Sequence, residues 1–185
     1  LPSVLFALQN GKRVGISTYT INLQEQLLHK DIPMLQKWLQ KEFSVALLKG
    51  RNNYLCRRRW QLYAAQAEKE TLPFYLRLGV WLTKTKTGDI SELSLLGRDK
   101  FLWNTVAATK ENCLGIACPF FRKGCFVQEA RVKAAEAELV IINHSLLLAG
   151  STMEKGVLPP LPYLVVDEAH HLSKVAEEQM TVSLS

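Results

Sequence analysis

Short aliphatic runs alternate with amphipathic segments towards both ends of the chain. Four of these runs predict strands, at residues 12–18, 43–48, 139–142 and 164–166. The run at 164–166 is uninterrupted aliphatic sequence, which is typical of a parallel strand buried on both faces. Because predicted strands and helices alternate, the pattern favours an α/β fold, with a parallel sheet connected by right-handed crossovers.

The segments between these strands have the spacing of helices. Thr18 or Thr20 can cap a helix after the first strand, because a hydroxyl oxygen can accept a bond from a free backbone N–H group. A second helix is expected to restart at Asp31 and Pro33, since proline is tolerated in a first helical turn. Two more helices are predicted at 126–137 and 144–149.

The middle of the chain has a different character. From Cys56 to about Thr109 the sequence predicts helices without strands, and the polar stretch 85–89 interrupts them. The three helical segments are 57–69, 73–83 and 98–108. We therefore expect an inserted, mostly helical subdomain within the α/β fold.

Length and composition limit the class of protein. The chain has 185 residues, 48% of them hydrophobic, which is enough for one core with a small insertion. Its longest apolar runs are far shorter than the roughly 20 residues of a membrane-spanning helix, so we expect no membrane contact. The first residues lack an initiating Met and a basic flank. We interpret them as the tail of a helix cut from a longer protein, and not as a secretory signal.

The net charge of +6 is modest, but part of it is concentrated. Five basic residues lie within eleven positions: Lys49, Arg51, Arg57, Arg58 and Arg59. Such a cluster favours a phosphate-rich partner, although Arg57–Arg59 could instead lie on a solvated helix face. The nearby Tyr54, Trp60 and Tyr63 could stack on nucleic-acid bases or belong to the core.

The four cysteines are candidate metal ligands. Cys113, Cys118 and Cys125 form a Cys-x4-Cys-x6-Cys array, and Cys56 precedes them by 56 intervening residues. Thiolates are soft ligands, and four of them without a neighbouring His or carboxylate suit an iron–sulfur cluster or a structural zinc. In the absence of a targeting signal we expect a reducing cytosol and metal-bound thiolates, not disulfides.

A second candidate site follows the predicted strand at 164–166. Asp167 and Glu168 lie where a parallel strand ends, which is where open α/β sheets bind ligands. In that place Asp167 can hold a Mg²⁺ ion bridging nucleotide phosphates, and Glu168 can orient or deprotonate the attacking water. His170 can relay the nucleotide state to a neighbouring surface. The alternative is that Asp167 only caps the following helix.

These motifs together resemble a known family. Asp167-Glu168-Ala169-His170 resembles motif II, the Walker B or DEAH box, of superfamily-two helicases, and residues 16–20 with 23–27 resemble their motif Ia. Several other segments look like the bacterial DinG helicases, relatives of XPD. They are residues 49–56, 87–93, the three clustered cysteines and residues 140–144. The resemblance runs from about residue 13 to 178 and keeps the motif order of the family.

The resemblance implies an ATP-dependent DNA helicase that translocates 5′ to 3′ and acts in repair or replication. It implies a partial RecA-like motor domain with an inserted [4Fe-4S] cluster subdomain, and ATP and Mg²⁺ as ligands of the whole protein. The implied cluster ligands are Cys56, Cys113, Cys118 and Cys125. The implied domain limits are 1–55 and 126–178 for the motor domain, 56–125 for the cluster domain and 179–185 for the start of an arch segment.

The implied partners are single-stranded DNA and duplex junctions, in the bacterial cytoplasm, with the protein a monomer. The family's motif Ia grips a DNA backbone, and Ser17, Thr18 and Thr20 offer hydroxyl and N–H groups for this, although they could equally be helix caps. Further candidates for DNA contact are Arg57, Arg58, Arg59, Arg122 and Lys123.

The sequence lacks one part that ATP hydrolysis needs. No Gly-x-x-x-x-Gly-Lys-Ser/Thr loop occurs, since Gly11-Lys12-Arg13 has the Lys without the first Gly or the hydroxyl. We therefore expect this chain alone not to hydrolyse ATP. Two other functions remain open from the residues alone. One is a non-enzymatic zinc-binding nucleic-acid-binding module, and the other is a thiol enzyme with His144 as its base.

Overall fold

The computed structural model describes residues 2–152 and 158–180. The chain divides into two compact units. The sheet unit consists of Leu1–Lys49 and Ala130–Ser185, and the helical unit consists of Gly50–Glu129. The helical unit begins and ends several residues outside the predicted 56–125. Its extra residues belong there because Tyr54 and Leu55 form isolated bridges with Asp89 and Ala107.

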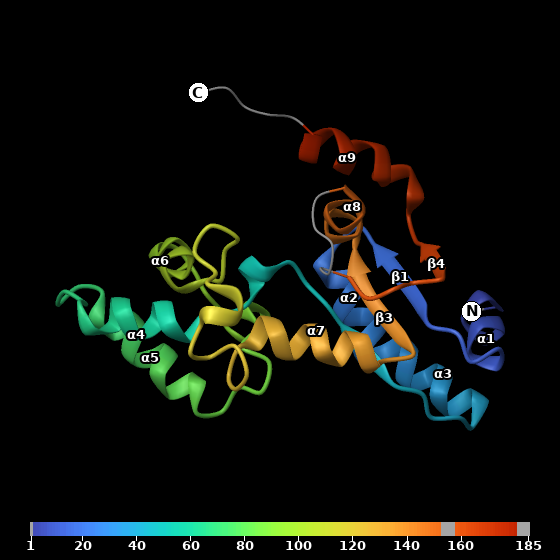
Figure 1. Ribbon diagram of the computed structural model, residues 1–185, viewed down its shortest axis with the longest axis horizontal. Coiled ribbons are helices and arrows are strands. Elements are labelled where there is room, and N and C mark those ends of the chain that lie inside the picture. Colours follow the sequence, from blue (N-terminus) through green and yellow to red (C-terminus); the bar gives the residue numbers. More distant parts are fainter. Residues whose placement is uncertain (1, 153–157, 181–185) are drawn as a thin grey trace. The chain divides into compact units, whose positions relative to one another are not determined.

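The sheet unit is built on parallel strands (Figure 1). The strands are β1 (Val14–Thr18), β2 (Val45–Leu47), β3 (Leu139–Asn143) and β4 (Tyr163–Val166). Their order is β2-β3-β1-β4, and every neighbouring pair is parallel. Val14 of β1 pairs with Leu139 on one side and with Tyr163 on the other. The predicted α/β fold with a parallel sheet is confirmed.

Aliphatic side chains of the inner strands fill a core on each face of this sheet. Val14, Ile16, Leu139 and Ile141 pack with helix α3 (Ile32–Leu39) on one face. Val140 and Ile142 pack on the other face, against residues of helices α7 (Phe126–Glu136) and α8 (His144–Thr152). Side chains of a strand alternate between faces, so the four aliphatic residues of β3 supply both cores.

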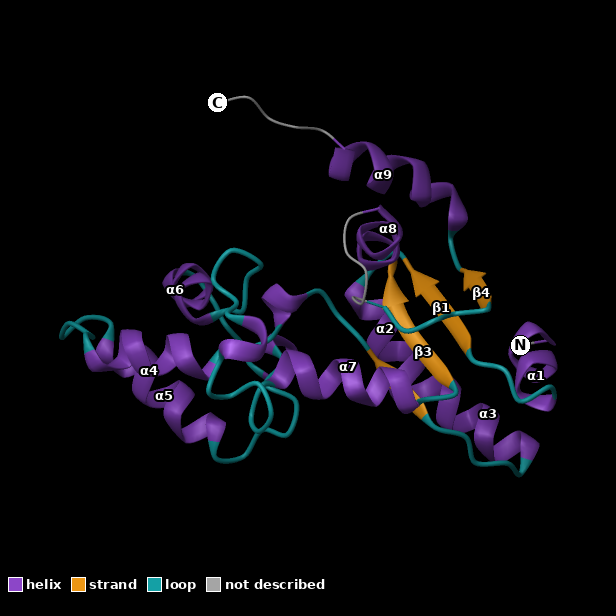
Figure 2. Ribbon diagram, in the orientation of Figure 1, coloured by secondary structure: helices purple, strands orange, loops and turns teal. Residues whose placement is uncertain are grey.

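Helices connect and flank the strands (Figure 2). They are α1 (Pro2–Gln9), α2 (Ile21–Gln26), α3 (Ile32–Leu39), α7 (Phe126–Glu136), α8 (His144–Thr152) and α9 (Leu172–Met180). The predicted restart at Asp31 is wrong in one respect, because a π-helical turn, Leu27–Asp31, joins α2 directly to α3. Pro33 has no N–H, and in a regular α-helix its ring would clash with the carbonyl of His29. In the wider π-helical turn, the backbone can continue as a helix through Pro33 without this clash.

Strand β4 is less buried than its sequence predicts. Tyr163 and Leu164 are 38% and 41% exposed, and Val165 and Val166 are half-buried. In the ranges that the structure describes, β4 pairs with β1 alone and stands at the edge of the sheet. The expectation of a strand buried on both faces is therefore wrong, because aliphatic composition does not distinguish an inner strand from an outer one.

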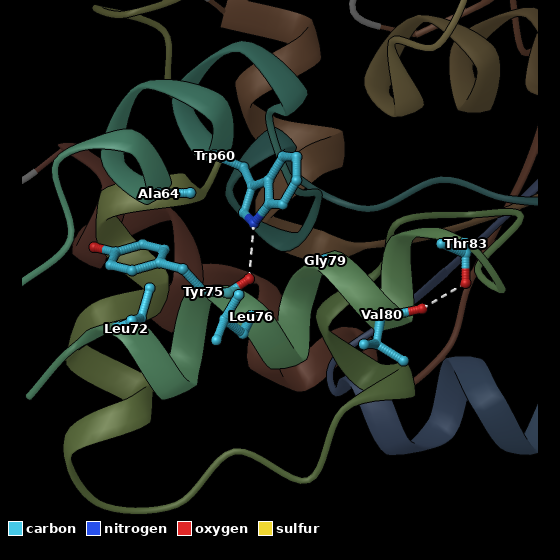
Figure 3. Close-up of a pocket in the computed structure, with 8 residues that line it drawn as sticks. All are labelled: Trp60, Ala64, Leu72, Tyr75, Leu76, Gly79, Val80 and Thr83. Atoms are coloured by element: carbon cyan, nitrogen blue, oxygen red, sulfur yellow. Dashed lines mark hydrogen bonds between the residues drawn. The ribbon is translucent and has the colours of Figure 1, made fainter. Parts of the chain in front are cut away.

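The helical unit contains α4 (Arg57–Ala65), α5 (Leu72–Leu82) and α6 (Arg98–Val106), close to the three predicted segments. The Trp60 indole Nε1 donates to the Tyr75 carbonyl at 3.1 Å, which ties α4 to α5 (Figure 3). Gly79 allows this approach, since a Cβ there would lie 3.1 Å from the indole. Trp60 and Tyr75 also line an open apolar groove of about 370 Å³.

Two expectations concern residues at the limits of the described ranges. Of the expected arch segment, 179–185, only residues 179 and 180 are described, and they end α9. Across the described ranges no helix has both the length and the apolar character that spanning a membrane requires.

Candidate functional site

Asp167 and Glu168 lie at the carboxyl edge of the sheet, directly after β4. The Asp167 N–H donates to the Ser17 carbonyl at 2.9 Å and continues the pairing with β1. The Asp167 Oδ1 accepts from the Glu168 N–H at 3.1 Å, and both side chains are exposed. That bond joins neighbouring residues, whereas a helix cap binds an N–H two or three positions further on. The geometry leaves both carboxylates open to a ligand at this edge.

The turn after these carboxylates is linked to the residue that follows β1. Glu168 has a φ of +49°, an uncommon left-handed conformation for a residue with a side chain. The His170 and His171 rings lie 4.0 Å apart, and the His171 ring stacks on Tyr19 with centroids 4.0 Å apart and planes within 15°. A displacement of the Asp167–His171 turn would therefore move the ring that stacks on Tyr19, a residue of the motif Ia segment.

A layer of buried polar side chains underlies this edge. It consists of Ser17, Thr18, Gln24, Lys49 and His144. The Ser17 Oγ lies 2.7 Å from the His144 Nδ1, and neither residue has exposed surface. The His144 Nε2 and both side-chain amide atoms of Gln24 are buried without a hydrogen-bond partner in the described part of the chain. Such atoms cost about 1–3 kcal/mol each, so this layer is energetically expensive to keep.

The three hydroxyl residues of motif Ia do not share one role. Ser17 and Thr18 are fully buried, and Thr18 Oγ1 donates to the Thr20 carbonyl at 3.2 Å. Thr20 is exposed and caps α2, since its hydroxyl accepts from the Leu23 N–H at 3.3 Å. Buried hydroxyls do not reach a phosphate in this arrangement. The side chains of Ser17 and Thr18 are therefore not available for a DNA contact, whereas the exposed side chain of Thr20 is.

All four cysteines lie in the helical unit as free thiols. Cys56 directly precedes α4, and Cys125 directly precedes α7. Cys118 follows a 3-10 turn in the loop between α6 and α7, and Cys113 is exposed. The fold thus brings residues far apart in sequence into one unit, as a shared ligand set requires.

Burial and the other three cysteines both act on the pKa of the Cys125 thiol. Burial raises the pKa of the Cys125 thiol above its usual value, and the other three cysteines raise it further, while a backbone hydrogen bond at Gln128 lowers it. Each thiol therefore lies within electrostatic range of Cys125. No three His, Cys, Asp or Glu residues in the described ranges stand close enough to hold a metal ion as they are. The chemistry of the donor set, four thiols, nevertheless suits a thiolate-bound metal group.

Arg57 packs against both neighbours of Cys125. Its Cζ lies 4.6 Å from the centroid of the Phe126 ring. A Cβ on Gly124 would lie 3.4 Å from the Arg57 Cδ and Nε, and Gly124 itself has a φ of +98°. The Arg57 Nε is buried and has no hydrogen-bond partner in the described ranges. Arg57 is half-buried, with its Nε packed inside its own unit.

Arg58 and Arg59 also bind their own unit. Arg58 Nη2 donates to the Asn112 carbonyl at 2.7 Å, beside Cys113. Arg59 Nη1 donates to the Ala107 carbonyl at 2.7 Å, and its Nη2 to the Asn104 carbonyl at 3.1 Å. All three arginines are half-buried. Their contacts oppose both sequence-based interpretations, DNA contact and a solvated helix face, and we assign them to internal packing.

Two basic residues of the cysteine loop remain open to a partner. Arg122 and Lys123 are exposed, whereas Lys49 is buried against Glu25 with its Nζ 2.6 Å from the Oε1. The helical unit holds 13 of the 23 basic residues and 7 of the 17 acidic residues. The entire net charge of +6 therefore belongs to this unit, which favours it as the face for a phosphate-rich partner.

Comparison with known proteins identifies relatives of the chain. The chain is 38% identical over 186 residues to the ATP-dependent DNA helicase YoaA of Escherichia coli, which covers 97% of the chain and 29% of that protein. It is 36% identical to the ATP-dependent helicase DinG of Mycobacterium tuberculosis, over 94% of the chain and 29% of that protein. Nearly the whole chain is thus similar to one segment of DinG-type helicases. A third DinG-type relative, from Bacillus subtilis, is named a 3′-5′ exonuclease and is 35% identical over 97% of the chain.

The match to the DinG-type relatives confirms the resemblance that the motifs predict. No family model matches the chain. The chain spans about 29% of the length of the first two of these relatives and 19% of the third. The DinG-type motifs at residues 16–20, 140–144 and 167–170 all meet at the carboxyl edge of the sheet.

Sequence reasoning missed two features of this chain. One is the Ser17–His144 pair, which links two motifs that the sequence shows only as separate segments. The other is the inward role of Arg57, Arg58 and Arg59. The one available signal was that this basic run directly follows Cys56, a position where charge can serve a metal site as well as DNA.

Proposed function

We propose that the protein to which this chain belongs is an ATP-dependent DNA helicase that moves 5′ to 3′. The observation that carries the proposal is the alignment of nearly the whole chain with relatives named ATP-dependent DNA helicases. The exposed Asp167 and Glu168 at the carboxyl edge of a parallel sheet support it, because nucleotides bind at that edge of α/β folds.

In this proposal Asp167 holds the Mg²⁺ ion that accompanies ATP. Glu168 orients the attacking water and accepts its proton at a carboxylate oxygen. His170 is a relay, because its ring neighbours His171, which stacks on Tyr19. The motion of the turn on hydrolysis would thus reach the segment that carries Thr20. Because the sequence has no phosphate loop, we expect this chain by itself not to hydrolyse ATP.

Glu168→Gln in the whole protein tests the nucleotide site. The amide cannot accept the proton, so we expect DNA-stimulated ATP hydrolysis to fall about 100-fold or more, with ATP still bound. Glu178→Gln on α9 is the matched control and should hydrolyse ATP at the normal rate. An active Glu168→Gln protein would contradict the assignment of Glu168.

For DNA, we propose contact through Thr20, Arg122 and Lys123, with single-stranded DNA and duplex junctions as partners. The exposure of these residues and the charge of the helical unit support this. Reversal of Arg122 and Lys123 to Glu should weaken DNA binding uniformly across sequences, because phosphate contacts carry no sequence information. The slope of log affinity against log salt should fall by about 2. Reversal of the exposed Lys37 and Lys41 in the sheet unit is the control, and equal losses in both variants would contradict the assignment.

We further propose that Cys56, Cys113, Cys118 and Cys125 ligate a [4Fe-4S] cluster. Four free thiols in one unit, three of which act electrostatically on Cys125, support it. When bound, the cluster would cross-link the start of α4, the start of α7 and the loop that precedes α7. A single zinc ion per chain is the alternative that metal analysis would reveal.

A further inference from the structure

Arg57 occupies the space between the cysteine segments. It follows Cys56 in sequence and contacts Gly124 and Phe126, the two neighbours of Cys125. Phe126 is 4% exposed and is itself seated on Gly88, where a Cβ would lie 2.2 Å from the ring. The guanidinium group is therefore held in place from two sides, next to the two cysteines that begin α4 and α7.

The polar contacts of Arg57 differ from those of the next two arginines. Arg58 and Arg59 donate to backbone carbonyl groups at 2.7–3.1 Å. The Arg57 Nε–H is buried and finds no acceptor in the residues that the structure describes. Buried N–H groups are rarely left without an acceptor, so one packed against Gly124 and Phe126, the neighbours of Cys125, suggests an acceptor at the cysteine site.

We propose that Arg57 is a positioning residue for the metal group bound by the four cysteines. Its Nε–H donates to a sulfur of that group or of its thiolates, and its positive charge offsets their negative charge. The inference rests on the proposed cluster. Hydrogen bonds to sulfur and nearby positive charge stabilise the reduced state, which carries one more electron, and they raise the reduction potential of a cluster.

The test compares three variants of the protein, purified without oxygen. Arg57→Gln removes the charge and the Nε–H, and Arg57→Lys keeps the charge without an N–H at that position. Arg59→Gln is the control, since it removes the same charge from the same helix but contacts α6 instead of the cysteine segments. The measurements are iron per chain, the rate of iron loss to a chelator, and the reduction potential from a titration followed by electron paramagnetic resonance.

We expect Arg57→Gln to have a more negative potential than the unsubstituted protein and to lose iron about tenfold faster. Arg57→Lys should have an intermediate potential, and Arg59→Gln should match the unsubstituted protein. If Arg57→Gln binds no iron, the reduction potential of Arg57→Lys, compared with that of the unsubstituted protein, tests the role of Arg57 instead. An unchanged potential in the Arg57 variants, or an equal shift in Arg59→Gln, would overturn the role of Arg57. An unsubstituted protein without iron would instead refute the proposed cluster.

Discussion

The sheet unit and the helical unit are stabilised by different kinds of contact. In the sheet unit, aliphatic side chains of β1 and β3 fill a core on each face. In the helical unit, long side chains donate to backbone carbonyl groups of distant segments, as Arg58 does to Asn112 and Trp103 does to Asn52. The helical unit also buries apolar side chains, among them Leu78 and Val106, so its directed bonds supplement hydrophobic burial.

The two units also differ in net charge. The sheet unit has ten basic and ten acidic residues, so its formal charge is zero, while the helical unit carries +6. Like charges repel in a compact unit, and four thiolates bound to iron would offset part of this charge. If the proposed cluster binds, we therefore expect its removal to destabilise the helical unit more than the sheet unit.

The largest expected effect is that of Cys56→Ser, which should alter the helical unit and leave the sheet unit unchanged. Cys56→Ser removes one thiolate, and we expect iron to fall from about four per chain to near zero, since a hydroxyl is a poor ligand for this metal. Amide hydrogen exchange should accelerate throughout 50–129, while the amides of β1 and β3 keep their protection. Equal loss of protection in both units would show that they fold as one.

A glycine pair tests the packing of the helical unit. Gly88→Ala would place a Cβ 2.2 Å from the Phe126 ring at a φ of +64°, and we expect a loss of about 3 kcal/mol or more in unfolding free energy. Gly97→Ala is the control, because Gly97 also has a positive φ, +51°, but nothing lies within 4 Å of the added carbon. Its cost should be about 1–2 kcal/mol. Denaturant unfolding measures both, and equal costs would contradict the role of the Gly88–Phe126 contact.

In the sheet unit, Ser17→Ala tests the buried polar layer. It leaves the His144 Nδ1 unpaired next to an Nε2 that already has no partner, so we expect a loss of about 1–3 kcal/mol. Thr20→Ala removes an exposed cap nearby and should cost about 1 kcal/mol. A Ser17→Ala protein as stable as the unsubstituted one would show that the pair is not energetically coupled to the fold.

The smallest expected effect concerns the Cys125 thiol in metal-free protein. Because burial raises its pKa, a smaller fraction is thiolate at a given pH than in the unfolded chain. Alkylation of Cys125 should therefore be slower in the folded protein, and its rate should rise with pH through a higher midpoint than in urea. Mass spectrometry of the Cys125 peptide measures this, and an equal or lower midpoint in the folded protein would contradict the burial of the thiol.

The sequence predicts the sheet unit better than the helical unit, and the reason is physical. The strand β3 reveals itself because four of its five side chains, Leu139 to Ile142, are aliphatic, and the position of Asp167 at a strand end is predicted because it follows a similar run. The partners of Arg57 and the Ser17–His144 bond are not predictable in this way. They join residues tens of positions apart, and no periodic pattern marks a single directed contact.

Metal analysis of the protein purified without oxygen tests the central claim most directly, that four thiolates organise the helical unit around an iron–sulfur cluster. The account predicts about four iron atoms and four acid-labile sulfides per chain, with a brown colour that is lost together with the protection of the 50–129 amides. A colourless protein with one zinc per chain, or a metal-free protein whose helical unit is fully protected, would contradict it.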